Sequence, residues 1–108
     1  MSGGGSYGGG GGGGPDEGVN CNSLRFRTSL NSPVPAVIAT LKVKDELTLA
    51  QKKADGPLLA IAPSGAVAGS IAGSLLLQLL RCMEEGHGYK AVVIKVTGGN
   101  VEVEIMHS

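Results

Sequence analysis

The residues that could carry chemistry in this chain are few and widely spaced. Cys21 and Cys82 form no CxxC pair, and no Cys/His cluster surrounds either of them in the sequence. This spacing predicts neither a disulfide framework nor a metal site, so we expect free thiols, as in cytoplasmic proteins. The start of the chain has no basic region followed by an apolar stretch, so we expect no secretory signal. Cys82 shares the apolar stripe of a predicted helix, which indicates inert packing.

The histidines and glycines do not indicate catalysis. His87 lies between two glycines and His107 is next to the last residue, and neither has a carboxylate or nucleophile partner by spacing. A single loop histidine is more often solvated than a general base. Ser64-Gly65 lacks the flanks of a nucleophile elbow, and no Gly-Lys-Ser/Thr follows the leader glycines. We therefore expect no enzymatic activity, no cofactor and no metal.

Cationic side chains give the clearest indication of binding. They cluster in the part of the chain after the leader, as Arg25, Arg27, Lys42, Lys44, Lys52 and Lys53. Together they could follow a phosphate backbone, in which case binding would be salt-sensitive. Stacked bases also need aromatic platforms, and Tyr89 is the expected one because Phe26 alternates with core residues. The formal net charge of zero argues against a strongly electrostatic partner overall.

The elements that must position these side chains belong to one domain behind a glycine-rich leader. Residues 1–20 hold almost no apolar side chains, so we expect a disordered tether, and residues 21–108 form the folded domain. Alternation in residues 23–30 predicts a strand with Leu24, Phe26, Thr28 and Leu30 on one face. Further strands are expected in residues 46–51, 57–62 and 66–71, with a helical turn or a strand in residues 36–41.

The last segment predicts a β-hairpin that turns at Gly98-Gly99, where positive φ is tolerated. Closing it there places three apolar pairs on one face: Val96 with Val101, Ile94 with Val103, and Val92 with Ile105. Lys95 faces Glu102 on the other side, where opposite charges stabilise the pair. A slip of one residue would expose the apolar face, so this register is well specified.

The uncharged stretch of residues 56–80 has two interpretations. It is long enough to cross a bilayer, and Gly65, Gly69 and Gly73 have the spacing of membrane helix dimers. We favour a fold in water, because Pro63-Ser64-Gly65 is a turn signature that divides the stretch into two strands and a helix. A glycine-zipper membrane protein is the less favoured alternative.

The predicted helix covers about residues 71–85, with an apolar stripe at helical spacing. Ser70 or Ser74 is expected to cap its start, and Gly86 to take the left-handed position after its end. In the fold in water, Gly69 and Gly73 allow a neighbouring element to approach the backbone closely. The expected fold class is α+β and mostly β: a small antiparallel barrel of about six strands with one packed helix.

The order of these elements resembles the HIRAN domain, an OB-like barrel. The resemblance covers about residues 41–96. Its motifs are Lys44-Asp45-Glu46-Leu47, Leu59-Ala60-Ile61-Ala62, a Gly65–Ile71 return, a leucine-rich helix (residues 75–83), Glu85-Gly86, and residues 89–93. What the resemblance implies is a site for a single-stranded DNA end, in a domain that is usually attached to a remodelling or nuclease partner.

From the residues themselves we expect a non-catalytic binding or adaptor module, an accessory to a larger bacterial-type protein system in the cytoplasm. The expected partner is a protein. The alternative is binding of single-stranded DNA ends through the basic strand face that carries Arg25 and Arg27.

Overall fold

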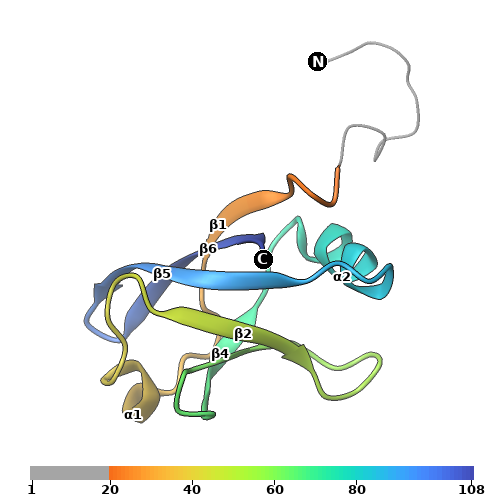
Figure 1. Ribbon diagram of the computed structural model, residues 1–108. Helices are drawn as coiled ribbons and strands as arrows, with labels where there is room; N and C mark the ends of the chain where they lie inside the picture. Colours follow the sequence, from red (N-terminus) through yellow and green to blue (C-terminus); the bar gives the residue numbers. More distant parts are fainter. Residues whose placement is uncertain (1–19) are drawn as a thin grey trace.

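The computed structural model describes residues 20–108, and the predicted leader lies outside the described residues apart from Asn20. Six strands form one antiparallel sheet in the order β1-β6-β5-β2-β3-β4. The strands are β1 (Arg25–Ser29), β2 (Glu46–Gln51), β3 (Leu58–Ile61), β4 (Val67–Ile71), β5 (Tyr89–Thr97) and β6 (Asn100–His107). The helices are α1 (Pro35–Ile38) and α2 (Leu76–Glu84), as Figure 1 shows. The predicted mostly β class with six antiparallel strands is confirmed.

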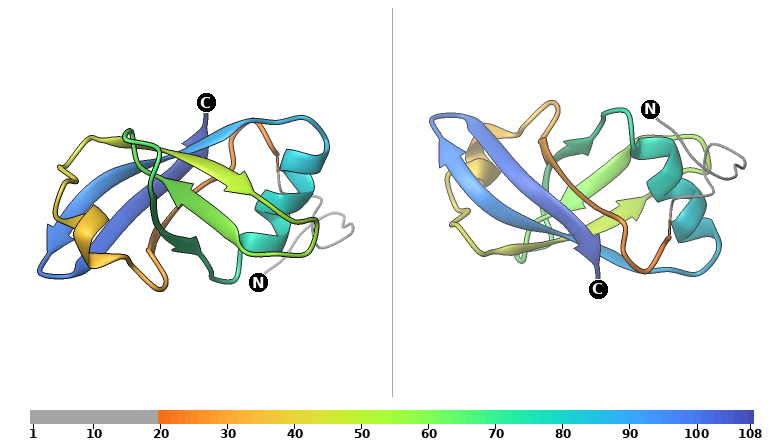
Figure 2. Two further views of the ribbon diagram at one scale, coloured as in Figure 1. Left: turned by 90° about the horizontal axis from the view of Figure 1, so that it is seen from below. Right: turned by 90° about the horizontal axis from the view of Figure 1, so that it is seen from above.

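The sheet curls into a half-barrel whose two outer strands meet at one point (Figure 2). Just beyond β1, the backbone of Asn31 exchanges hydrogen bonds of 2.8 and 2.9 Å with Ser70 of β4. Gly69 permits this contact, because a Cβ there would lie 3.0 Å from the Asn31 carbonyl oxygen and 3.1 Å from the Leu30 Cβ. The close backbone approach predicted for Gly69 is therefore confirmed.

The core lies inside the curl and follows the predicted alternation. Leu47 and Leu49 of β2 point inward while Thr48 is exposed, and Leu24 and Leu30 are buried on either side of β1. No charged or polar side chain is buried among the residues that the structure describes. Apolar burial at about 25 cal/mol per Å² is therefore the main favourable term in the stability of this barrel.

The two helices lie at opposite ends of the half-barrel, α1 near the β5–β6 turn and α2 at the other end (Figure 2). α2 begins later than predicted, because Ile71 still belongs to β4 and Gly73 (φ +117°) turns the chain before the first helical residue. The N-cap residue is Leu75, which makes no side-chain cap, so the predicted Ser70 or Ser74 cap is wrong. Gly86 has φ +103° and ends the helix as expected.

The uncharged stretch folds as strand, turn, strand and helix, so the alternative of one unbroken membrane helix over residues 56–80 is wrong. Within residues 20–108, neither helix has the length and apolar character needed to cross a bilayer.

A β-bulge in β5 makes the predicted register of the hairpin wrong in the half that lies away from the turn. Near the turn, Val96 pairs with Val101 and Lys95 with Glu102, as expected. The register shifts between Val93 and Lys95, so Val93 rather than Ile94 faces Val103. A bulge adds one unpaired residue and reverses which side chains point inward. In consequence Val93, Ala91 and Tyr89 are buried instead of Ile94 and Val92.

Candidate functional site

The two cysteines, expected to be free thiols, form a disulfide. Cys21 Sγ and Cys82 Sγ are 2.06 Å apart, with the Cα atoms 5.6 Å apart and a sequence separation of 61 residues. The expectation of free thiols, and of Cys82 as inert packing alone, is wrong. The curl of the sheet brings the segment before β1 beside α2, and a separation of 61 residues in the sequence does not reveal such a contact.

The end of α2 places three polar or reactive residues on one side of the molecule. Cys82 lies in the last turn of α2, and Glu85 is the C-cap residue. The left-handed Gly86 then reverses the chain, and the backbone N–H of His87 donates a 3.1 Å hydrogen bond to the Cys82 carbonyl oxygen. This bond holds the His87 backbone next to the carbonyl group of Cys82.

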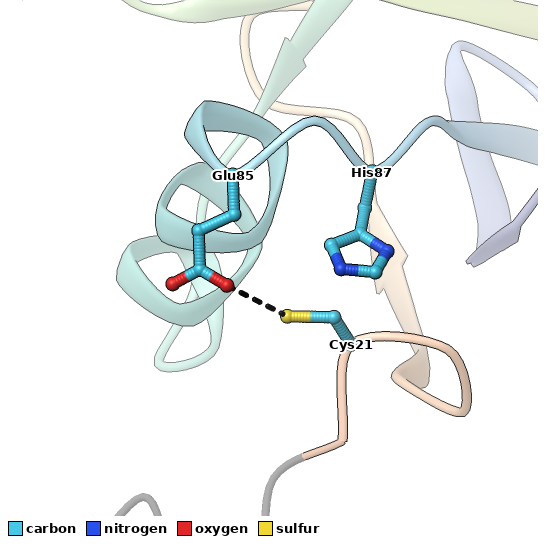
Figure 3. Close-up of side chains that lie close together, drawn as sticks. All are labelled: Cys21, Glu85 and His87. Carbon is cyan, nitrogen blue, oxygen red and sulfur yellow. Dashed lines mark hydrogen bonds between the residues drawn. The ribbon is translucent and has the colours of Figure 1, made fainter.

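Figure 3 shows Cys21, Glu85 and His87 converging from two parts of the chain. Cys21 comes from the segment before β1, whereas Glu85 and His87 follow α2. The Cys21 sulfur lies 4.0 Å from a Glu85 carboxylate oxygen, and one ligand atom from each of the three residues lies within 4.8 Å of the others. While the disulfide is intact the sulfur has no proton to donate, so its contact with Glu85 is a van der Waals contact.

His87 is not the solvated loop residue that the sequence predicted. It is half-buried, and its Nδ1 lies 3.1 Å from Nε2 of His107, the residue that ends β6. The His107 ring also meets the Tyr89 ring edge to face, with ring centroids 5.2 Å apart. His87, whose ring lies near the Cys21 sulfur, is therefore one of a pair of histidines.

Tyr89 belongs to this cluster and not to an exposed surface. Only 6% of the residue is exposed, and its hydroxyl donates a hydrogen bond to the backbone carbonyl oxygen of Cys21. Burial, with a smaller contribution from the charge of Glu85, raises the pKa of the Tyr89 phenol. Its ring is thus no open platform for a stacked base, which corrects the sequence-based expectation.

The cations on β1 lie beside carboxylates of β6. Arg25 Nε donates a 2.7 Å hydrogen bond to Glu104, and its side chain is 60% exposed. This hydrogen bond and charge hold the pKa of the Glu104 carboxyl below its usual value. Arg27 is exposed and adds a smaller effect in the same direction. Hence Arg25 is neutralised locally, while Arg27 projects from the same strand face.

The four predicted lysines do not join this face. Lys42 and Lys44 lie in the turn before β2, and Lys52 and Lys53 follow its end. The six residues of β2 span about 20 Å, so the two lysine pairs lie at opposite ends of the strand. The structure keeps Arg25 and Arg27 adjacent, but it does not assemble the predicted cations into one continuous track.

Within residues 20–108, the outer edge of β1 has no backbone hydrogen bond to another strand beside a shallow hollow, although the Thr28 hydroxyl donates to the Ser29 carbonyl oxygen at 3.4 Å. The Leu30 amide donates to Val101 of β6, whereas Asn31 turns its amide to β4. Because this direction alternates along a strand, the N–H and C=O groups of Arg27 and Ser29 also point away from β6. Among the described residues, the only β-bridge between this segment and β4 joins Asn31 to Ser70. β1 and the residues that follow β4 diverge from that point.

The divergence opens a hollow of about 210 Å³ between β1 and the start of α2. Its lining consists of Phe26, Arg27, Thr28, Ala72, Gly73, Ser74 and Leu75. As far as residues 20–108 go, the hollow combines apolar side chains with the Arg27 cation and the edge strand of the sheet. Sequence reasoning found the β1 face through Arg25 and Arg27, but it missed the hollow, because the hollow depends on where β4 parts from β1.

Comparison with known proteins adds no relative: no family model, curated protein or solved structure matches this chain significantly.

Proposed function

We propose that this protein is a non-catalytic cytoplasmic binding module that takes up an extended segment of a partner protein along the open edge of β1. The observation that carries the proposal is the direction of the Arg27 and Ser29 backbone groups, which point away from β6, with Arg27 lining the hollow. Unpaired edge groups are a template for strand addition, in which main-chain hydrogen bonds supply affinity.

The surroundings of β1 define the partner segment. Side chains of an added strand alternate between two faces. Those on the side of Phe26 and Thr28 would enter the hollow, which suits an apolar residue. Those on the side of Arg27 would face solvent. A carboxylate is favoured there, because it can pair with the charge of Arg27 while Glu104 accepts its hydrogen bonds from Arg25. The proposed ligand is an extended segment that alternates apolar and acidic residues.

Binding of a single-stranded DNA end, the activity that the HIRAN resemblance implies, is the second candidate. It is favoured by the presence of an aromatic residue, Phe26, and a cation, Arg27, in the lining of the same hollow. The lysine pairs at opposite ends of β2 and the burial of Tyr89 weigh against it. A phosphate track needs neighbouring cations and stacking needs an exposed ring face, so the protein segment is the better candidate.

The test is a titration of the isotope-labelled full chain with a synthetic peptide that alternates valine and glutamate, followed by amide NMR. We expect shifts confined to residues 25–30 and 72–75, with slowed hydrogen exchange at the amides of Arg27 and Ser29. Ser29→Pro removes an amide that points away from β6 and blocks strand addition, so it should abolish binding. Ser29→Ala keeps that amide and should bind like the wild type.

Two results would overturn the proposal. One is peptide binding that Ser29→Pro leaves unchanged. The other is absence of peptide binding together with salt-sensitive binding of a short oligothymidylate that survives Ser29→Pro. If the double change Arg25→Glu, Arg27→Glu then abolishes the oligothymidylate complex, β1 is a nucleic-acid surface.

A further inference from the structure

We propose that reduction of the Cys21–Cys82 disulfide converts the end of α2 into a zinc site formed by Cys21, Cys82, Glu85 and His87. The site is separate from the β1 edge, and the inference does not depend on the proposed partner binding. Two thiolates, an imidazole and a carboxylate are ligands that tetrahedral Zn²⁺ takes in proteins.

The positions of the ligand atoms support a single ion. One atom each from Cys21, Glu85 and His87 lies within 4.8 Å of the other two. Atoms at the corners of a triangle with that side lie about 2.8 Å from its centre. Zinc bonds are about 2.0–2.3 Å long, so each atom needs to move by less than about 1 Å. The fourth ligand, Cys82 Sγ, is the atom now bonded to Cys21 Sγ.

Local structure already orients these ligands. Cys82 and Glu85 are three residues apart at the end of α2, a spacing that places both side chains on one helix face. The hydrogen bond from the His87 amide to the Cys82 carbonyl oxygen holds the turn in place. Nδ1 of His87 lies 3.1 Å from Nε2 of His107, which leaves Nε2 of His87 for the metal. A second group bonded to a ligating imidazole in this way is typical of zinc sites.

Access and charge fit the same assignment. Glu85 is exposed, and Cys21 and His87 are half-buried, so an ion can enter from solvent. Two thiolates and one carboxylate would surround the dication with three negative charges. In an oxidised protein the sulfurs are bonded to each other and carry no charge, and the remaining Glu85 and His87 form an incomplete site.

The chemistry balances with a thiol reductant as the co-reactant. Two molecules of the thiol, or one dithiol, supply two electrons and two protons, the Sγ–Sγ bond breaks, and the reductant leaves as its own disulfide. Zinc then displaces the two protons to solvent as both Zn–S bonds form. In the reducing cytoplasm that we propose for this protein, the thiol form, and hence the zinc form, is favoured.

The experiment compares oxidised and phosphine-reduced full chain, each titrated with Co²⁺ as a spectroscopic probe and then with Zn²⁺. We expect the reduced protein to bind one Co²⁺ per chain with a thiolate-to-cobalt charge-transfer band that Zn²⁺ removes. The oxidised protein should show no such band, and its affinity for the ion should be lower by more than about 100-fold, beyond the loss caused by changing an outer-shell partner. Zn²⁺ should raise the unfolding temperature of the reduced protein only.

Matched variants locate the ion. Glu85→Ala and His87→Ala should each weaken Co²⁺ binding and alter the band, whereas Glu84→Ala, an exposed carboxylate one residue away, should change neither. His107→Ala removes a positioning residue and should weaken binding about 10–100-fold while the thiolate band remains. All four variants keep the disulfide, so their folding can be verified in the oxidised form before reduction. Absence of a thiolate band in reduced, folded protein would overturn the proposal, as would a band that neither Glu85→Ala nor His87→Ala alters.

Discussion

Reduction of the Cys21–Cys82 disulfide should destabilise the domain strongly, in the absence of added metal. The cross-link closes a loop with a sequence separation of 61 residues, which includes β1 to β4 and most of α2. In the chain-entropy model, a loop of this length restricts the unfolded chain by about 4 kcal/mol. Domains of this size have a total stability of about 5–15 kcal/mol. The disulfide therefore supplies a large fraction of the free energy of unfolding.

The assay is chemical and thermal unfolding of the full chain with and without a phosphine reductant, in a buffer that contains a strong chelator. We expect the unfolding temperature to fall by about 15–30 °C, because 1 kcal/mol shifts it by about 4–8 °C in a domain of this size. Reduction of the wild type keeps both sulfur atoms in place, so the comparison does not introduce a buried hydroxyl at Cys82, which is 2% exposed.

The control is Cys21→Ser, in which no disulfide can form and the reductant should have no effect. Its stability should match that of the reduced wild type within about 1 kcal/mol, since the half-buried Cys21 contributes little packing of its own. A difference of less than about 1 kcal/mol between oxidised and reduced wild type would refute the reasoning, because it would show that the cross-link does not restrict the unfolded ensemble.

Three further predictions concern the closure of the barrel and its polar contacts. Gly69→Ala should cost about 1–3 kcal/mol in urea unfolding, because the new Cβ overpacks the point where the outer strands meet, whereas Gly99→Ala, with nothing within 4 Å, should be nearly neutral. Tyr89→Phe should lower the free energy of unfolding by about 1 kcal/mol, since it removes the hydrogen bond to the backbone of the first cysteine. In a carboxyl NMR titration, the pKa of Glu104 should lie below that of an ordinary glutamate, and it should rise in Arg25→Gln. The stabilisation from this pair is present at pH values above the pKa of Glu104 in the unfolded chain, and it is lost as the pH falls through the lower pKa in the folded protein. In Arg25→Gln, the free energy of unfolding should therefore fall less over this pH range.

Most strands could be predicted because their signals are local. The alternation around Phe26 and around Leu49 repeats every two residues, and one face is half-buried in β1 and buried at Leu47 and Leu49 in β2, as that pattern requires. The turn at Gly65, with φ +93°, follows from a proline and a glycine within three residues. Such features need no knowledge of what the segment contacts.

The register of the last hairpin could be predicted only as far as its bulge. Both Val93 and Ile94 are apolar and β-branched, so the sequence supports either as the inward residue. A contact between Lys44 and β5 helps to decide which of the two residues points inward. The Lys44 amide donates a 2.7 Å hydrogen bond to the Val93 carbonyl oxygen. That contact joins distant segments, and no period in the local sequence encodes it.

The residues of the candidate sites could not be grouped from the sequence for the same reason. Cys21 and His107 lie near opposite ends of the described chain, and each is unremarkable in its own segment. They converge only because β1 and β6 are neighbours in the sheet and α2 lies at the end of the half-barrel beside them (Figure 1). The sequence could indicate the cationic face of β1, which lies on a single strand, but not a cluster whose members come from three elements.

The two proposals share the first segment of the domain, yet they can fail independently. The disulfide joins Cys21, which lies just before β1, to Cys82 of α2, whereas the proposed docking surface is the edge of β1 itself. Ser29→Pro lies at the other end of β1 and should leave the cobalt spectrum of the reduced protein unchanged. His87 lies near the Cys21 sulfur, and His87→Ala should leave peptide binding by the oxidised protein unchanged. If instead both variants impaired both activities, the end of α2 and the edge of β1 would have to be treated as one coupled site.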